Sequence, residues 1–252
     1  MKKNEALFEY VLRLADDALI NGQRLSEWCG HGPFLEEDVG VANTALDLIG
    51  RARLLLTYAG QLEGKGRDED ALAYGRDERE FRNVLMLELP NGDFAFTCVR
   101  QYLVDAYNSL LYGHLLESRD ETLAGIAGRA AKESAYHLRH TREWMLRLGD
   151  GTEESHMRSQ QALDRLWPYA AEFFTADAVT GVIGELGVGP DPQRLRHEWY
   201  SETRETFRRA TLEPGDEGFH PSGGRDGRHT EYMGFLLAEM QFLQRAYPGL
   251  TW

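Results

Sequence analysis

The sequence predicts an all-α protein whose centre is a four-helix bundle. Four amphipathic stretches, each more than twenty residues long, lie within the first 150 positions, and their apolar side chains recur at helical spacing. No alternating pattern of useful length indicates a strand, and no internal repeat is visible. The joints inside each pair of long stretches are short, which favours antiparallel neighbours.

The expected helices follow one another along the chain. They span 5–28, 36–59, 93–117, 120–149, 155–174 with a break near Pro168, 176–186, 192–210 and 230–246. Asp93 is a candidate N-cap. We expect 61–80 to be a solvated connection with one short helix at its end, and 214–228 to be a Gly/Pro-rich loop. The one long crossover, at 60–92, is the ferritin-like arrangement. We therefore expect a single ferritin-like domain over 1–252, with additional C-terminal helices.

Composition narrows the class of protein. Of 252 residues, 42% are hydrophobic and 27% are charged, which is ordinary for a globular chain. No apolar run approaches the ~20 residues of a membrane span, and the first residues lack the apolar core of a signal peptide, so we expect a cytoplasmic protein. The net charge of -13 would repel a phosphate backbone and argues against a nucleic-acid partner. Cys29 and Cys98 lack the spacing of a zinc, iron–sulfur or disulfide framework.

The helix expected at 120–149 carries the strongest candidate for metal chemistry. At 100° per residue one of its faces is apolar, and His137 lies in the middle of that face with Glu133 on its flank one turn earlier. A carboxylate and an imidazole therefore point inward together. In a helical bundle this is either the remnant of a metal site or a buried hydrogen-bonded pair, and we favour the pair.

A ferritin-like di-iron site requires two Glu-x-x-His motifs and two further glutamates on core helices. The literal motif occurs at Glu153 and His156, beside a turn, and at Glu217 and His220, inside the Gly/Pro-rich loop. Neither pair lies on an expected core helix. We therefore expect neither pair to be a ligand pair.

On the core helices the motif is incomplete. Tyr136 follows Glu133 where histidine is required, and Gly50 follows Asp47 in the same way. Asp47 has an alternative as an i,i+4 partner of Arg51. The candidates for a vestigial site are Asp17, Asp47, Glu133 and His137, and helix one also offers Asn21. We expect no catalytic, cofactor-binding or metal-binding residue in this chain.

Other candidate constellations are weaker. The glycine-rich run 181–190 follows no strand and has no Lys-Ser/Thr pair, so a phosphate-binding loop is not supported. His229 begins a helix directly after the flexible loop, and we interpret it as a capping or interface residue before a catalytic one.

The helices expected at 36–59 and 93–117 are apolar around most of their circumference. One four-helix core does not easily bury two such helices on every side. The pattern therefore predicts a leftover apolar surface that a partner protein covers.

Several motifs resemble the C subunits of bacterial phenylacetyl-CoA 1,2-epoxidases, also called phenylacetate-CoA oxygenases. They are LSEWCGHGP at 25–33, ALDLIG at 45–50, KESAYHLRH at 132–140, HTEYMG at 229–234 and LLAEMQFLQR at 236–245. The resemblance covers nearly the whole chain. It implies a ferritin-like, non-catalytic subunit that pairs with the homologous di-iron A subunits, which are catalytic. It also implies a reductase subunit that delivers electrons from NADPH, while O2 epoxidises the aromatic ring.

The residues leave alternatives open beside this structural subunit. One is an autonomous di-iron or manganese oxidase or oxygenase with a divergent metal site, and another is a stand-alone helical binding protein. The incomplete ligand pattern argues against the first. A homodimer of the isolated chain is a further expectation, and no membrane partner is expected.

Overall fold

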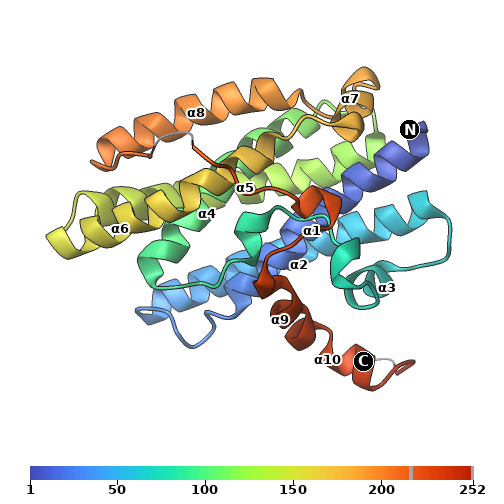
Figure 1. Cartoon of the computed structure of the whole chain (residues 1–252), viewed down its shortest axis with the longest axis horizontal. Coiled ribbons are helices and arrows are strands. Elements are labelled where there is room, and N and C mark those ends of the chain that lie inside the picture. The colour runs from blue at the N-terminus through green and yellow to red at the C-terminus, as the bar shows by residue number, and fades with distance from the viewer. Residues whose placement is uncertain (216–217, 251–252) are drawn as a thin grey trace. The chain divides into compact units, whose positions relative to one another are not determined.

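The computed structural model describes residues 1–215 and 218–250, and over these residues the secondary structure is helical, without strands (Figure 1). The chain divides into two compact units. The first unit comprises Met1–Pro90 with Ser222–Trp252, and the second comprises Asn91–Pro221. The single domain expected over 1–252 stays a prediction.

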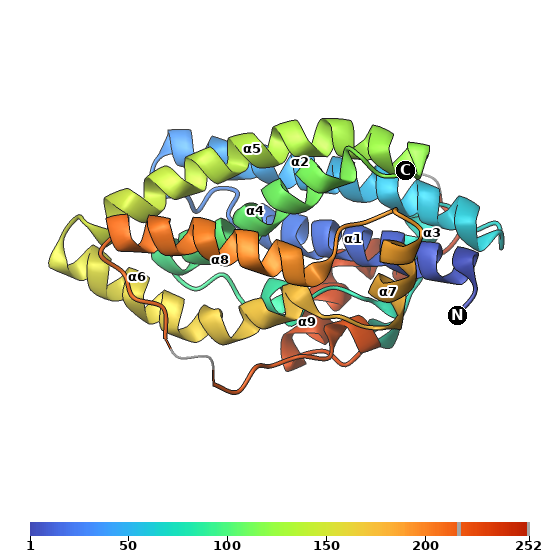
Figure 2. The ribbon, with the colours of Figure 1, turned by 90° about the horizontal axis from the view of Figure 1, so that it is seen from above.

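The first unit is built on an antiparallel pair of long helices, α1 (Lys3–Ser26) and α2 (Leu35–Glu63), which lie side by side in both ribbon views (Figures 1 and 2). Asp38 closes the turn between them, because its carboxylate accepts hydrogen bonds from the N–H groups of Gly30 at 3.1 Å and Gly32 at 2.9 Å. The helix α2 ends at Gly64, whose φ of 68° is the left-handed conformation that glycine adopts without strain. The pair buries one apolar face of each helix.

Smaller elements complete the first unit. They are α3 (Glu69–Tyr74), η1 (Glu78–Glu80), η2 (Leu85–Glu88), η4 (Gly224–Asp226), α9 (Glu231–Met240) and α10 (Phe242–Ala246). The solvated connection expected at 61–80 is wrong in part. Arg76 is only 1% exposed and forms a buried ion pair with Asp16 of α1. Within this charge run Arg76 is buried because Asp16, on another helix, compensates its charge.

The last helix expected, 230–246, is interrupted. It ends at Met240 and resumes at Phe242, and Gln241 between the two helices is buried. The side-chain amide of Gln241 donates hydrogen bonds to the backbone carbonyls of Ala73 at 3.1 Å and Arg76 at 3.0 Å. These bonds hold the C-terminal segment against the connection that follows α2.

The second unit contains the other antiparallel pair, α4 (Phe94–Leu115) and α5 (Glu121–Gly149). Its further elements are α6 (Glu153–Leu166), η3 (Trp167–Phe174), α7 (Ala178–Glu185) and α8 (Pro192–Arg209). Asp93 and Asp120 cap the long helices, since each carboxylate accepts a backbone N–H three residues later at 2.8 Å. The break expected near Pro168 is confirmed, because the chain continues there as a 3₁₀ helix.

The helix α4 is buried on nearly every side, because α5, α6 and α8 all pack against it. Aromatic rings also contact α4: its Tyr107 stacks on Phe173 of η3 with ring centroids 4.7 Å apart, and its Tyr102 meets Phe207 of α8 edge-on at 5.8 Å. The leftover apolar surface expected on helix 93–117 is therefore consumed within its own unit. On α2, in contrast, five large apolar side chains stay exposed: Leu35, Val39, Leu46, Ile49 and Leu54.

Candidate functional site

The inward face expected on the α5 helix is confirmed for most of its members. The buried members are Leu123, Ala127, Ala130, Ser134, His137, Thr141 and Met145. The half-buried members are Ile126, Trp144 and Leu148. His137 is 2% exposed. The helical period therefore placed the imidazole correctly.

The two other residues of the incomplete motif on α5 face more outward. Glu133 forms an ion pair with Arg129, whose Nε lies 2.5 Å from its Oε1. Tyr136, at the position where Glu-x-x-His requires imidazole, is 58% exposed, and the guanidinium of Arg139 lies over its ring at 5.3 Å. A histidine at position 136 would thus lie on the outer side of α5. The pair expected between Glu133 and His137 stays a prediction.

A buried polar cluster joins α4 to α5, and sequence reasoning missed its central residue, Asp105. Gln101 donates to Oδ1 of Asp105 at 2.7 Å, and the hydroxyl of Thr141 donates to Oδ2 at 3.1 Å. The same hydroxyl lies 3.0 Å from the backbone oxygen of His137. The available signal was an aspartate between two apolar runs, 102–104 and 106–107. Side-chain donors already satisfy both carboxylate oxygens, which is the arrangement of a structural aspartate.

Asp17 lies in the first unit and forms an ion pair with Arg225, from the far end of the chain. Arg225 donates from Nη1 to Oδ1 at 3.0 Å and from Nη2 to Oδ2 at 2.7 Å, and the N–H of Val84 donates to Oδ1 at 2.9 Å. Burial raises the pKa of Asp17 above its usual value, although Arg225 and Val84 favour the charged form. This carboxylate is committed to a structural ion pair.

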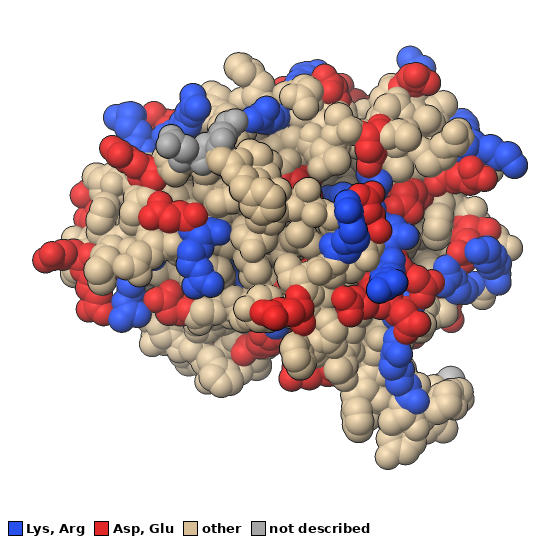
Figure 3. Space-filling model, viewed as in Figure 1, with Lys and Arg blue, Asp and Glu red and all other residues tan. Residues whose placement is uncertain are grey.

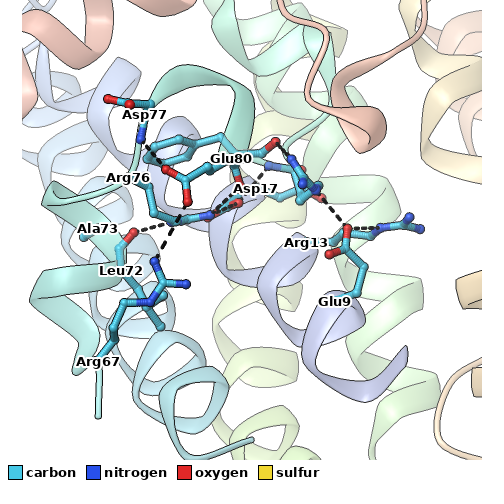
Figure 4. Close-up of polar contacts among 12 residues, drawn as sticks. Glu9, Arg13, Asp17, Arg67, Leu72, Ala73, Arg76, Asp77 and Glu80 are labelled. Atoms are coloured by element: carbon cyan, nitrogen blue, oxygen red, sulfur yellow. Dashed lines mark hydrogen bonds and ion pairs between the residues drawn. The ribbon is translucent and has the colours of Figure 1, made fainter. Parts of the chain in front are cut away.

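Other charged groups crowd the same region of the first unit (Figure 4). Arg76 donates from Nη1 to Oδ2 of Asp16 at 2.9 Å and to the backbone oxygen of Glu80 at 3.0 Å. The backbone N–H of Arg82 donates to the same Oδ2 at 2.8 Å. Adjacent aspartates on α1 thus each have an arginine partner, which compensates the cost of burying them.

Glu88 is the centre of a second buried cluster in the first unit. Its Oε1 lies 2.6 Å from Nδ1 of His229, and its Oε2 accepts from the backbone N–H and the hydroxyl of Thr230, both at 2.7 Å. Burial alone would lower the pKa of His229, but the hydrogen bond and charge of Glu88 outweigh it and raise the pKa above 6.5. The residue that caps α9 is Thr230, whereas His229 contacts Glu88 and the backbone oxygen of Phe81 and does not cap the helix.

The remaining core candidates lie on α1 and α2. Asp47 is half-buried, and Gly50 three residues later has no side chain to offer a metal. A Cβ built on Gly50 would have no neighbouring atom within 4 Å. Asn21 is 1% exposed, and its side-chain nitrogen and oxygen have no hydrogen-bond partner within the described part of the chain.

The literal Glu-x-x-His motifs are not on long helices of either pair. Nδ1 of His156 lies 2.8 Å from the backbone oxygen of Gly149, and Nδ1 of His220 lies 3.3 Å from that of Pro168. Glu217 lies outside the described residues. Over residues 1–215 and 218–250, no group of three or more His, Cys, Asp or Glu side chains is arranged to hold a metal ion.

Surface charge is mixed. Figure 3 shows acidic and basic side chains interspersed over one face of the molecule. In the described ranges, no helix has both the length and the apolar character that crossing a bilayer requires.

A family model described as phenylacetic acid catabolic protein matches residues 1–252. The chain belongs to this family. Among curated proteins, the C subunit of 1,2-phenylacetyl-CoA epoxidase from Escherichia coli (strain K12) is 49% identical over 246 residues, which cover 98% of this chain and 99% of the relative. The resemblance drawn from the five motifs is therefore confirmed. The family is ferritin-like, so the all-α, ferritin-like fold class is confirmed as well.

Proposed function

We propose that this chain is a non-catalytic structural subunit of a multicomponent oxygenase that epoxidises the ring of phenylacetyl-CoA in aerobic phenylacetate catabolism. The observation that supports the proposal most is the 49% identity to the C subunit of 1,2-phenylacetyl-CoA epoxidase over 98% of the chain. The match runs along the whole length of both chains, which supports the same place in the complex. In the proposal, this chain supports a homologous di-iron catalytic subunit in the cytoplasm, and the complex also contains a reductase.

The donor set of this chain does not fit a di-iron centre of its own. Such a centre requires four carboxylates and two imidazoles on core helices. Here Asp17 is held in two hydrogen bonds by Arg225, and Gly50 and Tyr136 occupy the two positions for imidazole. Releasing Asp17 for a metal would leave a largely buried guanidinium without its partner, which is costly. The proposal therefore places the irons in the homologous subunit.

Iron loading separates the proposal from an autonomous di-iron enzyme. Purify this chain and its di-iron homologue separately, load both with Fe²⁺ under anaerobic conditions, remove loose metal, and measure iron per chain. We expect two tightly held irons in the homologue and far less than one in this chain. Two tightly held irons in this chain would contradict the proposal and favour the autonomous enzyme.

A further inference from the structure

Two asparagine–glycine pairs occur in the sequence, and the structure places them in different surroundings. Asn91 and Gly92 lie in the loop before α4, outside any helix, whereas Asn21 and Gly22 lie inside α1. An asparagine followed by glycine is open to spontaneous deamidation, because glycine has no side chain that shields its backbone nitrogen. The reaction also requires the backbone to rotate, which a loop permits and a helix opposes.

The backbone nitrogen that attacks in this reaction is accessible at Gly92 and engaged at Gly22. Gly92 is exposed, and none of the residues that the structure describes accepts a hydrogen bond from its N–H. Gly22 is buried, and its N–H belongs to the backbone hydrogen-bond ladder of α1. Turning the nitrogen of Gly22 toward a side chain would break the helix, so the nitrogen of Gly92 is the reactive one of the two.

The side-chain carbonyl of Asn91 is polarised by a buried guanidinium. Nη2 of Arg100 donates a hydrogen bond to Oδ1 of Asn91. Negative charge develops on this oxygen when a nitrogen attacks the carbonyl carbon, and a fixed cationic donor stabilises such charge. At Asn21 the side-chain oxygen has no hydrogen-bond donor in the described part of the sequence. The contact with Arg100 therefore favours the attack at Asn91 and not at Asn21.

We propose that Asn91 is a site of spontaneous deamidation, at the point where the chain passes from the first unit to the second. The backbone nitrogen of Gly92 loses its proton and bonds to Cγ of Asn91, and the side-chain nitrogen takes up a proton and leaves as ammonia. The product is a cyclic succinimide. Water then opens the ring at either of its carbonyls and leaves aspartate or isoaspartate. Water is the only co-reactant, nothing is oxidised or reduced, and the inference stands apart from the proposed function.

The two products have different effects on the loop before α4. Asn91 also anchors this loop through its backbone oxygen, which accepts a hydrogen bond from Oγ1 of Thr97 at 2.8 Å. Aspartate keeps the backbone and offers Arg100 a charged acceptor, so both contacts persist. Isoaspartate inserts the Cβ into the backbone and leaves the carboxylate on Cα, which displaces the acceptors of Thr97 and Arg100. We therefore expect the isoaspartate form to be the less stable one.

The test compares deamidation of the full chain when it is folded and when it is unfolded in guanidinium chloride, at the same mildly alkaline pH. Peptide mapping by mass spectrometry follows both asparagines, and methylation by an isoaspartyl methyltransferase reports isoaspartate. In guanidinium chloride both should react at similar rates, because glycine follows each of them. In the folded chain we expect Asn21 to slow at least about a hundredfold, since it reacts only when α1 opens, and Asn91 to stay within about tenfold of its unfolded rate.

Two variants at the same position provide the controls. Asn91→Gln retains a side-chain amide but closes the ring much more slowly, so the product at this position should disappear in both the folded and the unfolded chain. Asn91→Asp represents the aspartate product and should resist guanidinium chloride at least as well as wild type. The isoaspartate form, separated from aged protein by anion exchange, should unfold at a lower guanidinium concentration than Asn91→Asp.

The folded-state rates decide the inference. A folded chain in which Asn91 is as slow as Asn21, or in which Asn21 reacts as fast as Asn91, would overturn the assignment of position 91 as the modification site. An isoaspartate form that is as stable as Asn91→Asp would overturn the effect assigned to the displaced contacts.

Discussion

Arg225 and Asp17 form a two-bond ion pair between residues 208 positions apart in the sequence. The pair fastens the Gly/Pro-rich segment that contains Arg225 to α1, and the side chains are only 10% and 15% exposed. It also occupies a carboxylate that the sequence offered as part of a vestigial metal site. Its strength can be measured directly.

Arg225→Met should destabilise the protein by about 2 to 4 kcal/mol, because it leaves a largely buried carboxylate without its partner. Arg228→Met in the same segment is the control, since Arg228 pairs with Asp226 on the surface and should change stability by less than about 0.5 kcal/mol. Urea unfolding of both variants measures the difference. Equal effects would mean that the buried pair contributes no more than the exposed one.

Stability should depend on pH through His229. Its pKa is raised in the folded state by Glu88 despite the opposing effect of burial, so the stabilisation is complete below the unfolded-state pKa near 6.5 and is lost as pH rises through the folded-state value. The difference in unfolding free energy between wild type and His229→Gln should therefore shrink as pH rises above about 6.5. Because wild type and His229→Gln are compared at the same pH, the contributions of all other titrating groups to stability cancel. A difference that is constant over this range would contradict the assignment of a charged His229–Glu88 pair.

Two glycines of α2 should respond to alanine in opposite directions. Gly50→Ala should raise the unfolding free energy of the chain by up to about 1 kcal/mol, because alanine favours the helix and the added Cβ meets open space. At Gly60 the added Cβ would lie 2.2 Å from the backbone oxygen of Arg67, so Gly60→Ala should destabilise. Thermal unfolding at low protein concentration checks both signs. Destabilisation by Gly50→Ala would show that position 50 packs inside the chain.

His137→Leu should cost roughly 1 to 3 kcal/mol of stability, because the imidazole is buried and the polar partner that we expect beside it would lose its hydrogen bond. Turnover per folded, assembled oxygenase should stay nearly unchanged. Unfolding free energy and steady-state turnover are measured on the same preparations. Loss of turnover by orders of magnitude with unchanged melting and assembly would assign His137 a catalytic role.

The sequence predicted those features that depend on neighbouring residues. The cap at Asp93, the inward position of His137 and the break near Pro168 all follow from helical period and local chemistry. Helix order and approximate boundaries could therefore be predicted for most of the chain.

Features that depend on distant partners could not be predicted in this way. The run 61–80 looks solvated because its charges are dense, yet Arg76 is buried by Asp16, which lies 60 positions earlier. The last helix is interrupted at Gln241, whose side chain donates to the backbone carbonyls of Ala73 and Arg76. The sequence near position 241 does not indicate these two acceptors, so the break could not be predicted. Asp105 was missed because one of its two partners, Thr141, lies 36 positions later on α5, although the other, Gln101, is one helical turn away.

Reconstitution of the oxygenase tests the central claim most directly. Purify the iron-loaded di-iron homologue, add the reductase components and NADPH, and measure epoxidation of phenylacetyl-CoA with and without this chain while recording the mass of the assembly. We expect turnover and correct assembly only when this chain is present, although it carries no iron of its own. A di-iron homologue that is soluble, correctly assembled and fully active without this chain would contradict the structural role proposed for it.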